Sequence, residues 1–287
     1  MGCRRAYRFG GGKAEARNGG ERTDYAVYLG PVQNRLLASM SAETFNHLRP
    51  HLERVPLRRR EILQERNRPL EHVHFIEQGV ASLFARTSRD GPVEVAMIGR
   101  LGLVGIPVVL GTMRSPNRCL VQVPGEALRI ESEDLRQAID ACPELRQQLM
   151  NYVQALLVQN SQSVLCNVRH ELRERLCRWL LLACDRLDDR MVPVTHDLLS
   201  MTLGVRRAGV TTALAKLEAT GALHRSRGAI EVVDRGILEQ GTCECYRIIS
   251  REYSRLTARA PSSTERPQEF ERPQELWLER GATALDR

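Results

Sequence analysis

Residues 192–233 constrain the fold most, because two helical patterns separated by a glycine are followed there by a short strand pattern. Thr195 stands just before the first apolar pattern, where its hydroxyl can cap the first backbone N–H groups of a helix. Asp197 in the first turn suits the positive end of that helix. Gly204 then permits the left-handed backbone of a tight turn. The stretch therefore predicts a first helix that ends in a sharp turn.

A second helix is predicted over about residues 206–220. Its core-facing positions recur at helical spacing and are Val210, Leu214 and Leu217. Gly221 and Gly228 bracket the next run, which predicts a β-hairpin. The alternative is an ordinary helical hairpin with solvated arginines. The β-hairpin directly behind the second helix favours a winged helix-turn-helix.

Basic and hydroxyl side chains occupy the positions of this motif that suit contact with DNA. They are Arg206, Arg207, Thr211, Thr212, Arg225 and Arg227. A recognition helix presents its N-terminal residues to base edges in the major groove, and an arginine there can bond to guanine O6 and N7. We therefore predict that Arg207 contacts a base. Arg225 and Arg227, near the tip of the hairpin, are predicted to contact phosphates.

Composition is compatible with this prediction and excludes other classes. The 287 residues suffice for about two domains, and the net charge of +7 favours an anionic partner. No apolar run approaches the roughly 18 residues of a transmembrane helix, so no membrane contact is expected. The N-terminus lacks the apolar core of a signal peptide. We expect a cytoplasmic protein whose eight cysteines are mostly reduced.

Short strand patterns recur between about residues 61 and 130, which favours an antiparallel barrel or jelly roll. The pattern predicts separate strands over residues 80–86, 93–98, 118–123 and 127–130. Turns are predicted at residues 78–79, 88–91 and 124–125. Before the strands, residues 34–54 predict one or two short helices, the second with Ser41 as its cap.

A long helix is predicted from residue 144 to about residue 168. Its apolar stripe continues into a polar position and comprises Leu145, Leu149, Tyr152, Leu156 and Asn160. A long helix with one seam usually pairs with another helix, and this one is longer than a barrel of this size needs. We therefore predict that the stripe is a dimer interface. The alternative is that it packs on its own barrel. Further helices are predicted over residues 169–186 and 237–256.

The fold class is thus α+β, with a jelly-roll (double-stranded β-helix) domain, a long dimerisation helix and a C-terminal winged helix-turn-helix. The predicted divisions are an N-terminal segment (residues 1–30), the jelly-roll domain (31–142), the dimerisation helix (143–168), the winged helix-turn-helix domain (169–256) and a C-terminal tail (257–287). The first and last are glycine/arginine-rich or polar with a short repeat, and both are predicted to be disordered.

This order of elements resembles the cyclic-AMP receptor protein and fumarate–nitrate regulator (Crp/Fnr) family of bacterial transcription factors. The resemblance covers about residues 34–256, and its most specific part is LLSMTLGVRRAGVTTALAKLEATGAL, residues 198–223, with the wing behind it. The run Arg178-Trp179-Leu180-Leu181 is also similar. The resemblance implies a homodimer that binds a palindromic site on double-stranded DNA, contacts RNA polymerase, and activates or represses transcription.

The sequence departs from the family at the cyclic-nucleotide pocket. The resemblance places the pocket at Gly102, Leu103, Gly105 and Arg118. Leu103 stands where the family carries the glutamate for the ribose, and Arg118 lies outside the expected arginine motif. We therefore expect an unidentified signal rather than cyclic AMP. Only Cys3 lies near the N-terminus, so the family's iron–sulfur cluster is not expected, and no cofactor is predicted.

Cys243 and Cys245 form the sharpest cysteine pair, because two thiolates at this spacing can bind zinc or form a redox switch. No second pair with ligand spacing lies near them in the sequence, so packing is favoured and no metal site is predicted. Cys166, Cys177 and Cys184 are expected in the core. Catalytic motifs such as G-x-S-x-G and H-E-x-x-H are missing, so no enzyme is expected. The alternative function is a small-molecule or metal/redox sensor that acts through a protein partner.

Overall fold

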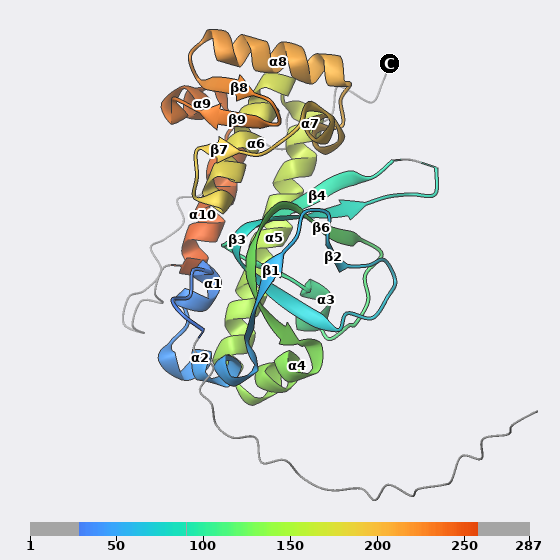
Figure 1. The fold of residues 1–287 in the computed structure, drawn as a ribbon, viewed down its shortest axis with the longest axis vertical. Coiled ribbons are helices and arrows are strands. Elements are labelled where there is room, and N and C mark those ends of the chain that lie inside the picture. Colours follow the sequence, from blue (N-terminus) through green and yellow to red (C-terminus); the bar gives the residue numbers. More distant parts are fainter. Residues whose placement is uncertain (1–28, 90, 258–287) are drawn as a thin grey trace, which may run out of the picture.

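A computed structural model describes residues 29–89 and 91–257 (Figure 1). The predicted disordered segments, apart from Leu29, Gly30 and Thr257, lie outside the described residues. Leu29, which lies within the first of these predicted segments, is buried in the core. None of the described helices is both long and apolar enough to cross a membrane.

Three short helical segments precede the strands: α1 (Arg35–Ala38), α2 (Ala42–Leu48) and the 3-10 helix η1 (Arg49–His51). Ser41 caps α2 as predicted, since its hydroxyl accepts the N–H of Thr44 at 3.1 Å. Asn34 caps α1 in the same way and also donates to the carbonyls of Ile76 and Gly102. The entry of the chain is therefore fixed to the barrel.

The barrel is antiparallel and built around two long strands. It comprises β1 (Glu53–Leu57), β2 (Ile62–Gln64), β3 (His72–Ala85), β4 (Val93–Ile98), β5 (Leu103–Val104) and β6 (Arg118–Glu131). The order is β1-β6-β3-β4, with β2 paired to β6 and β5 paired to β3. A short helix, α3 (Ile106–Val109), follows β5.

The predicted turns at residues 78–79 and 124–125 are wrong, because β3 and β6 run through them as continuous strands. The register of the two strands shifts around Gln78, which marks β-bulges. A Cβ on Gly79 would lie 2.5 Å from the Val123 carbonyl oxygen, and one on Gly125 would overlap that of Gln78. The glycines thus permit a close crossing where the strands bend instead of ending.

Two helices leave the barrel, α4 (Ser132–Ala141) and the long α5 (Pro143–Arg169). The predicted dimer stripe on α5 faces the chain's own core: Leu145, Leu149, Tyr152 and Leu156 are all buried within one copy. Tyr152 also donates its hydroxyl to the Leu103 carbonyl at 3.2 Å. The fifth member, Asn160, is partly buried with an unpaired side-chain oxygen. The prediction of a dimer interface at this stripe is therefore wrong, and the alternative, packing on the same chain, is correct.

The C-terminal part contains α6 (Leu172–Leu187), β7 (Met191–Val192), α7 (His196–Leu203), α8 (Arg207–Ala219), β8 (Leu223–Ser226), β9 (Ala229–Val232), α9 (Arg235–Gly241) and α10 (Cys245–Thr257). Its small sheet has the order β7-β9-β8. The single terminal helix predicted over residues 237–256 is instead two helices. Asp234 caps α9 by accepting from Ile237, and the chain turns before α10 begins.

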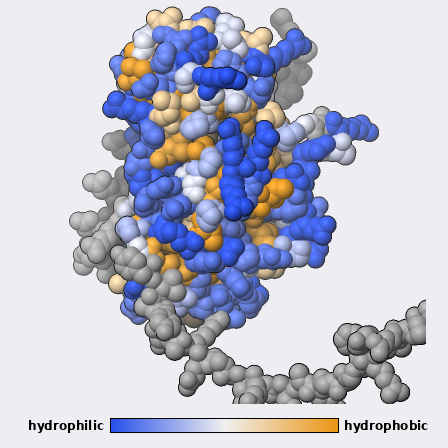
Figure 2. All heavy atoms as spheres, viewed as in Figure 1, coloured by the Kyte–Doolittle hydropathy of each residue, from blue (hydrophilic) through white to orange (hydrophobic). Residues whose placement is uncertain are grey.

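The arrangement places α8 at one end of the molecule, farthest from α2 and α4, while α10 runs back beside α5 and α6 (Figure 1). One hydrophobic core continues from the barrel into the winged domain, and a smaller cluster fills the rest of the barrel. Figure 2 shows that hydrophilic residues dominate this face and that hydrophobic residues surface mainly near its middle.

Candidate DNA-binding surface

The helix-turn-helix is formed by α7 and α8 as predicted. The Thr195 hydroxyl accepts the N–H of Leu198 at 3.2 Å, and Gly204 takes a left-handed conformation with a φ of 62°. The buried faces of the two helices consist of Leu199, Leu203, Val210, Leu214 and Leu217. Because these side chains fix both helices to the core, the opposite face of α8 is presented to solvent.

The N-terminus of α8 carries the predicted base contacts. Arg206 is the exposed N-cap residue, and its side chain makes no capping hydrogen bond. The side chain of Arg207 is 65% exposed, and its Nη1 lies 3.2 Å from Asp197 Oδ1 on α7. An exposed pair of this kind contributes little to stability. It orients Arg207 over the turn while leaving the guanidinium available to a stronger anionic or hydrogen-bonding partner.

The two threonines of α8 are exposed one turn further along. Their hydroxyls donate to the carbonyls of Arg207 and Ala208, each at 3.1 Å. Thr211 Oγ1 also lies 3.0 Å from Nδ1 of His196 on α7. The hydroxyl protons are therefore used within the helix, and the methyl groups and oxygen lone pairs remain for contacts with DNA.

The two arginines of the wing lie in different environments. Arg227 is exposed in the turn between β8 and β9, where a phosphate can reach it. Arg225 instead donates through Nε to Glu218 Oε2 at 2.7 Å, and its backbone N–H donates to Oε1 at 2.8 Å. These bonds lower the pKa of Glu218. Because Glu218 belongs to α8, Arg225 links the wing to the recognition helix instead of being a free phosphate contact.

The predicted ligand pocket does not form. Leu103 is fully buried, and a Cβ on Gly102 would overlap the Tyr152 hydroxyl. Gly105 is packed against the Val73 side chain. Leu103 pairs with Phe75 near one end of β3, whereas Arg118 pairs with Phe84 near the other. The four predicted residues are therefore not brought together around one cavity.

Arg118 lies instead at a basic cleft of about 610 Å³ between the barrel and α7. Its Nη2 and Nε contact Glu65 at 2.6 and 3.0 Å, and this pairing lowers the pKa of Glu65. The other arginines that line the cleft are Arg59, Arg60, Arg66 and Arg86, and α7 contributes Asp197 and Met201. Within the described ranges these four arginines form no ion pair, so the cleft holds an excess of positive charge.

Two family models match the chain in the order that the fold displays. The cyclic nucleotide-binding domain matches residues 54–142, and the Crp-like helix-turn-helix domain matches residues 174–240. The chain belongs to the Crp/Fnr family. It is therefore a DNA-binding transcription regulator with a sensor domain of the cyclic-nucleotide-binding type, and the family is non-enzymatic.

Solved Crp/Fnr structures share this fold at low sequence identity. FixK2 from Bradyrhizobium japonicum is 15% identical, with a TM-score of 0.54 over 67% of this chain and 98% of its own. The regulator CLP from Xanthomonas campestris is 17% identical, with a TM-score of 0.55 over 67% and 99%. The regulator TTHA1359 from Thermus thermophilus is 17% identical, with a TM-score of 0.55 over 66% of this chain and 97% of its own. Among curated proteins, none matches this chain significantly by sequence.

The sequence did not reveal two features of this Crp/Fnr regulator. The exposed face of α5 was missed because the buried stripe on the same helix gave the stronger apolar signal. A cluster of Cys166, His170, Cys243 and Cys245 was missed because its two halves lie far apart in the chain. The spacing Cys166-x-x-x-His170 is one helical turn, and it was the available sequence signal that these two side chains could act together as ligands.

Proposed function

We propose that this regulator is a homodimer that binds a palindromic site on double-stranded DNA and acts on RNA polymerase at promoters bearing that site. The observation that carries the proposal is the exposed N-terminus of α8. Its first residue, Arg207, has an exposed side chain, while the buried faces of α7 and α8 pack on the core. A recognition helix placed in this way enters the major groove. Arg207 then discriminates one base pair, and Arg227 contacts a phosphate.

The dimer is proposed to pair through the outward face of α5. Residues that are exposed, apart from the half-buried Met150, recur there at alternating spacings of three and four residues, the repeat of a coiled-coil seam. The seam comprises Gln147, Met150, Gln154, Leu157, Ser161, Val164 and Val168. Its apolar part is open, since Leu157 is 56%, Val164 65% and Val168 75% exposed. A second copy of the same helix fits this seam, because the exposed apolar side chains of each copy would then be covered by the identical side chains of the other.

The signal is proposed to be an anion bound in the basic cleft. Four unpaired arginines and Arg118 line one side, and the first helix of the helix-turn-helix closes the other. An anion there would change the charge that faces Asp197, the partner of Arg207. Cyclic AMP in the family's usual pocket is not proposed, because a buried leucine, Leu103, stands where the family carries the glutamate that binds the ribose.

Selection from random duplex DNA at moderate salt, followed by sequencing, tests the function. We expect an enriched palindrome with half-sites about 10 base pairs apart, centre to centre. Binding without an enriched sequence would contradict sequence-specific regulation. That result would favour the alternative, a sensor that acts through a protein partner.

A further inference from the structure

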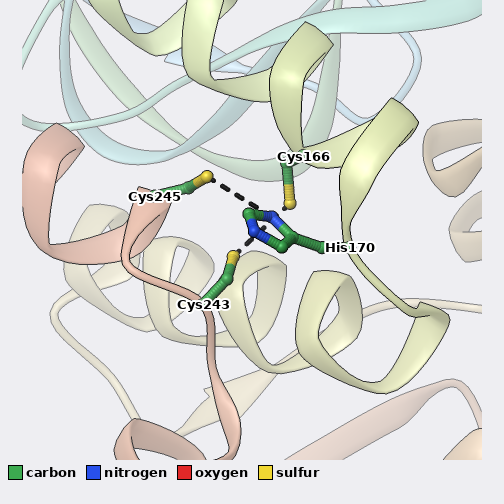
Figure 3. Close-up of side chains that lie close together, drawn as sticks. All are labelled: Cys166, His170, Cys243 and Cys245. Carbon is green, nitrogen blue, oxygen red and sulfur yellow. Dashed lines mark hydrogen bonds between the residues drawn. The ribbon is translucent and has the colours of Figure 1, made fainter. Parts of the chain in front are cut away.

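Three thiols and one imidazole gather at the corner where α5 meets α10 (Figure 3). Cys166 Sγ lies 3.5 Å from Cys243 Sγ, and Cys245 Sγ lies 3.6 Å from His170 Nδ1. All four potential ligand atoms lie within 4.8 Å of one another. None of these residues belongs to the DNA-binding surface, the α5 seam or the basic cleft.

Local structure accounts for this convergence. Cys166 lies in the last turn of α5, and His170 is its C-cap, whose N–H donates to the Cys166 carbonyl at 3.1 Å. Residues four apart on a helix share a face. Cys243 lies in the short link between α9 and α10, Cys245 is the first residue of α10, and both side chains turn toward the end of α5 (Figure 3).

We propose that Cys166, His170, Cys243 and Cys245 form a zinc-type metal site. Zinc in proteins is bound tetrahedrally, with Zn–S distances of about 2.3 Å and Zn–N distances of about 2.0 Å. The edges of such a tetrahedron are about 3.5–3.8 Å long. The two closest pairs, at 3.5 and 3.6 Å, already have these lengths.

The burial of the cluster is that of a closed, structural site. Cys166 and Cys245 are at most 1% exposed and Cys243 is 6% exposed, while His170 is half-buried, so the three thiols are shielded from solvent and the imidazole closes the fourth side. The thiols of Cys166 and Cys243 are in hydrogen-bonding contact, with either sulfur able to act as the donor. Metal binding replaces the thiol protons, which are released to solvent.

A buried cation balances the charge of the proposed site. Three thiolates and one zinc ion carry a net charge of −1, which is costly to bury without compensation. Arg178 on α6 is itself buried and donates from Nη1 to Ser163 Oγ on α5 at 3.2 Å. Its positive charge interacts with the side chains of Cys166 and Cys245, so its field favours the thiolate form that a metal requires.

The donor set decides between chemistries. Soft thiolates exclude magnesium and calcium, which take oxygen ligands. A Cys166–Cys243 disulfide would use only half of the cluster and leave the Cys245–His170 contact without a role. An iron–sulfur cluster is usually held by four cysteines, whereas three cysteines and one histidine form an established zinc ligand set.

A metal here would join elements that DNA binding must coordinate. Cys166 lies between Val164 and Val168, the last apolar members of the α5 seam, while Cys243 precedes α10 and Cys245 begins it. Zinc would therefore tie the end of the dimer helix to the last helices of the winged domain. Its occupancy would set the orientation of α8 relative to the seam.

Metal analysis of the full-length protein tests the site. Protein purified without chelator should hold about one zinc per chain. Metal-free protein should bind Co²⁺ to the same extent, with a thiolate-to-cobalt charge-transfer band and the visible spectrum of a tetrahedral ion. Cys245→Ser should lose the bound zinc and the band. Cys142→Ser is the matched control, because Cys142 is buried at the other end of α5 and lies 4.0 Å from Thr44 Oγ1, which can bond to the new hydroxyl.

Three results would overturn the assignment: wild-type protein with neither zinc nor a cobalt band, iron with inorganic sulfide in place of zinc, or full metal binding by Cys245→Ser. If Cys245→Ser does not fold, as judged by circular dichroism, the wild-type cobalt titration alone decides. Metal stoichiometry is independent of DNA binding, so failure here leaves the proposed function unaffected.

Discussion

The guanidinium carbon of Arg186 on α6 lies 4.8 Å from the centroid of the Tyr253 ring on α10. Arg186 is fully buried and also donates to the Met97 carbonyl on β4 at 3.1 Å and to Gln159 Oε1 on α5 at 2.5 Å. One cationic side chain therefore joins the barrel, the long helix and both ends of the winged domain. Arg186 is therefore a buried polar link between the sensor and DNA-binding parts.

Removal of this link should destabilise the whole protein. Arg186→Met retains apolar volume but leaves the Met97 carbonyl and the Gln159 amide buried without their donor. We expect a loss of about 3 kcal/mol in the free energy of unfolding, measured by urea denaturation. Arg190→Met is the control, because Arg190 is exposed three residues beyond the end of α6 and its loss should leave the urea midpoint unchanged. Equal midpoints for the two variants would contradict the role of Arg186.

Arg207 and Arg227 should differ in what they contribute to DNA binding. Arg207→Ala should relax the preference at one base pair of each half-site, worth about 1–3 kcal/mol. Arg227→Ala should weaken binding to all sequences alike and reduce the salt slope by about one. Titration of matched and mismatched duplexes at several salt concentrations measures both effects. Indistinguishable profiles for the two variants would refute the assignment of base and phosphate contacts.

The α5 seam should control the oligomeric state. Leu157→Glu combined with Val164→Glu places like charges in both copies of the proposed interface, and we expect the dimer to dissociate in sedimentation equilibrium. Asn151→Glu adds an exposed charge to the same helix beside the seam, so it should remain dimeric. A double variant that stays dimeric would place the interface elsewhere.

The helix-turn-helix was predictable because its signals are local: a capping threonine, a glycine at a left-handed turn and apolar residues at helical spacing. The strand breaks at Gly79 and Gly125 were predicted wrongly, because a bulge and a turn use the same residues and only the partner strand distinguishes them. The prediction of a dimer interface at the buried stripe of α5 failed for a related reason. Leu149 and Tyr152 show helical periodicity, but periodicity does not say whether the covering surface belongs to the same chain.

The candidate site was predictable to the same extent. The exposure of Arg207 and Arg227 followed from the motif, whereas the capture of Arg225 by Glu218 depends on how the hairpin folds against α8. Only the strand register shows that Gly102 and Arg118 do not line one pocket. The cluster around Cys166 could not be found from spacing alone, because tertiary packing of α10 against α5 brings its halves together.

The basic cleft should bind a polyanion through Arg66 and its neighbours. We expect pyrophosphate to raise the melting temperature of the wild-type protein, and this shift to be lost in the Arg66→Gln/Arg86→Gln double variant. Arg136→Gln on α4 is the control, since it removes an exposed arginine far from the cleft. Differential scanning fluorimetry with sulfate as a weaker anion measures the effect. An equal shift in all three proteins would indicate binding elsewhere.

Glu94 should make stability depend on pH. Its carboxyl is buried, accepts from Trp179 Nε1 at 3.2 Å and has an unpaired Oε2, and burial raises its pKa. A carboxyl whose pKa is higher in the folded than in the unfolded state favours folding while it is protonated. Its contribution is therefore lost as the pH rises from the ordinary carboxyl range toward the raised value.

Glu94→Gln keeps a carbonyl acceptor for Trp179 and removes the buried charge. We expect the variant to be more stable than the wild type at neutral pH, and this difference to shrink as the solution is acidified. Glu71→Gln, an exposed change at the edge of the barrel, should not alter the pH profile. Urea denaturation between mildly acidic and neutral pH provides the comparison. A Glu94→Gln variant that is less stable at neutral pH would show that Glu94 is held ionised by a partner, such as Arg178 on α6, whose charge opposes the rise in its pKa.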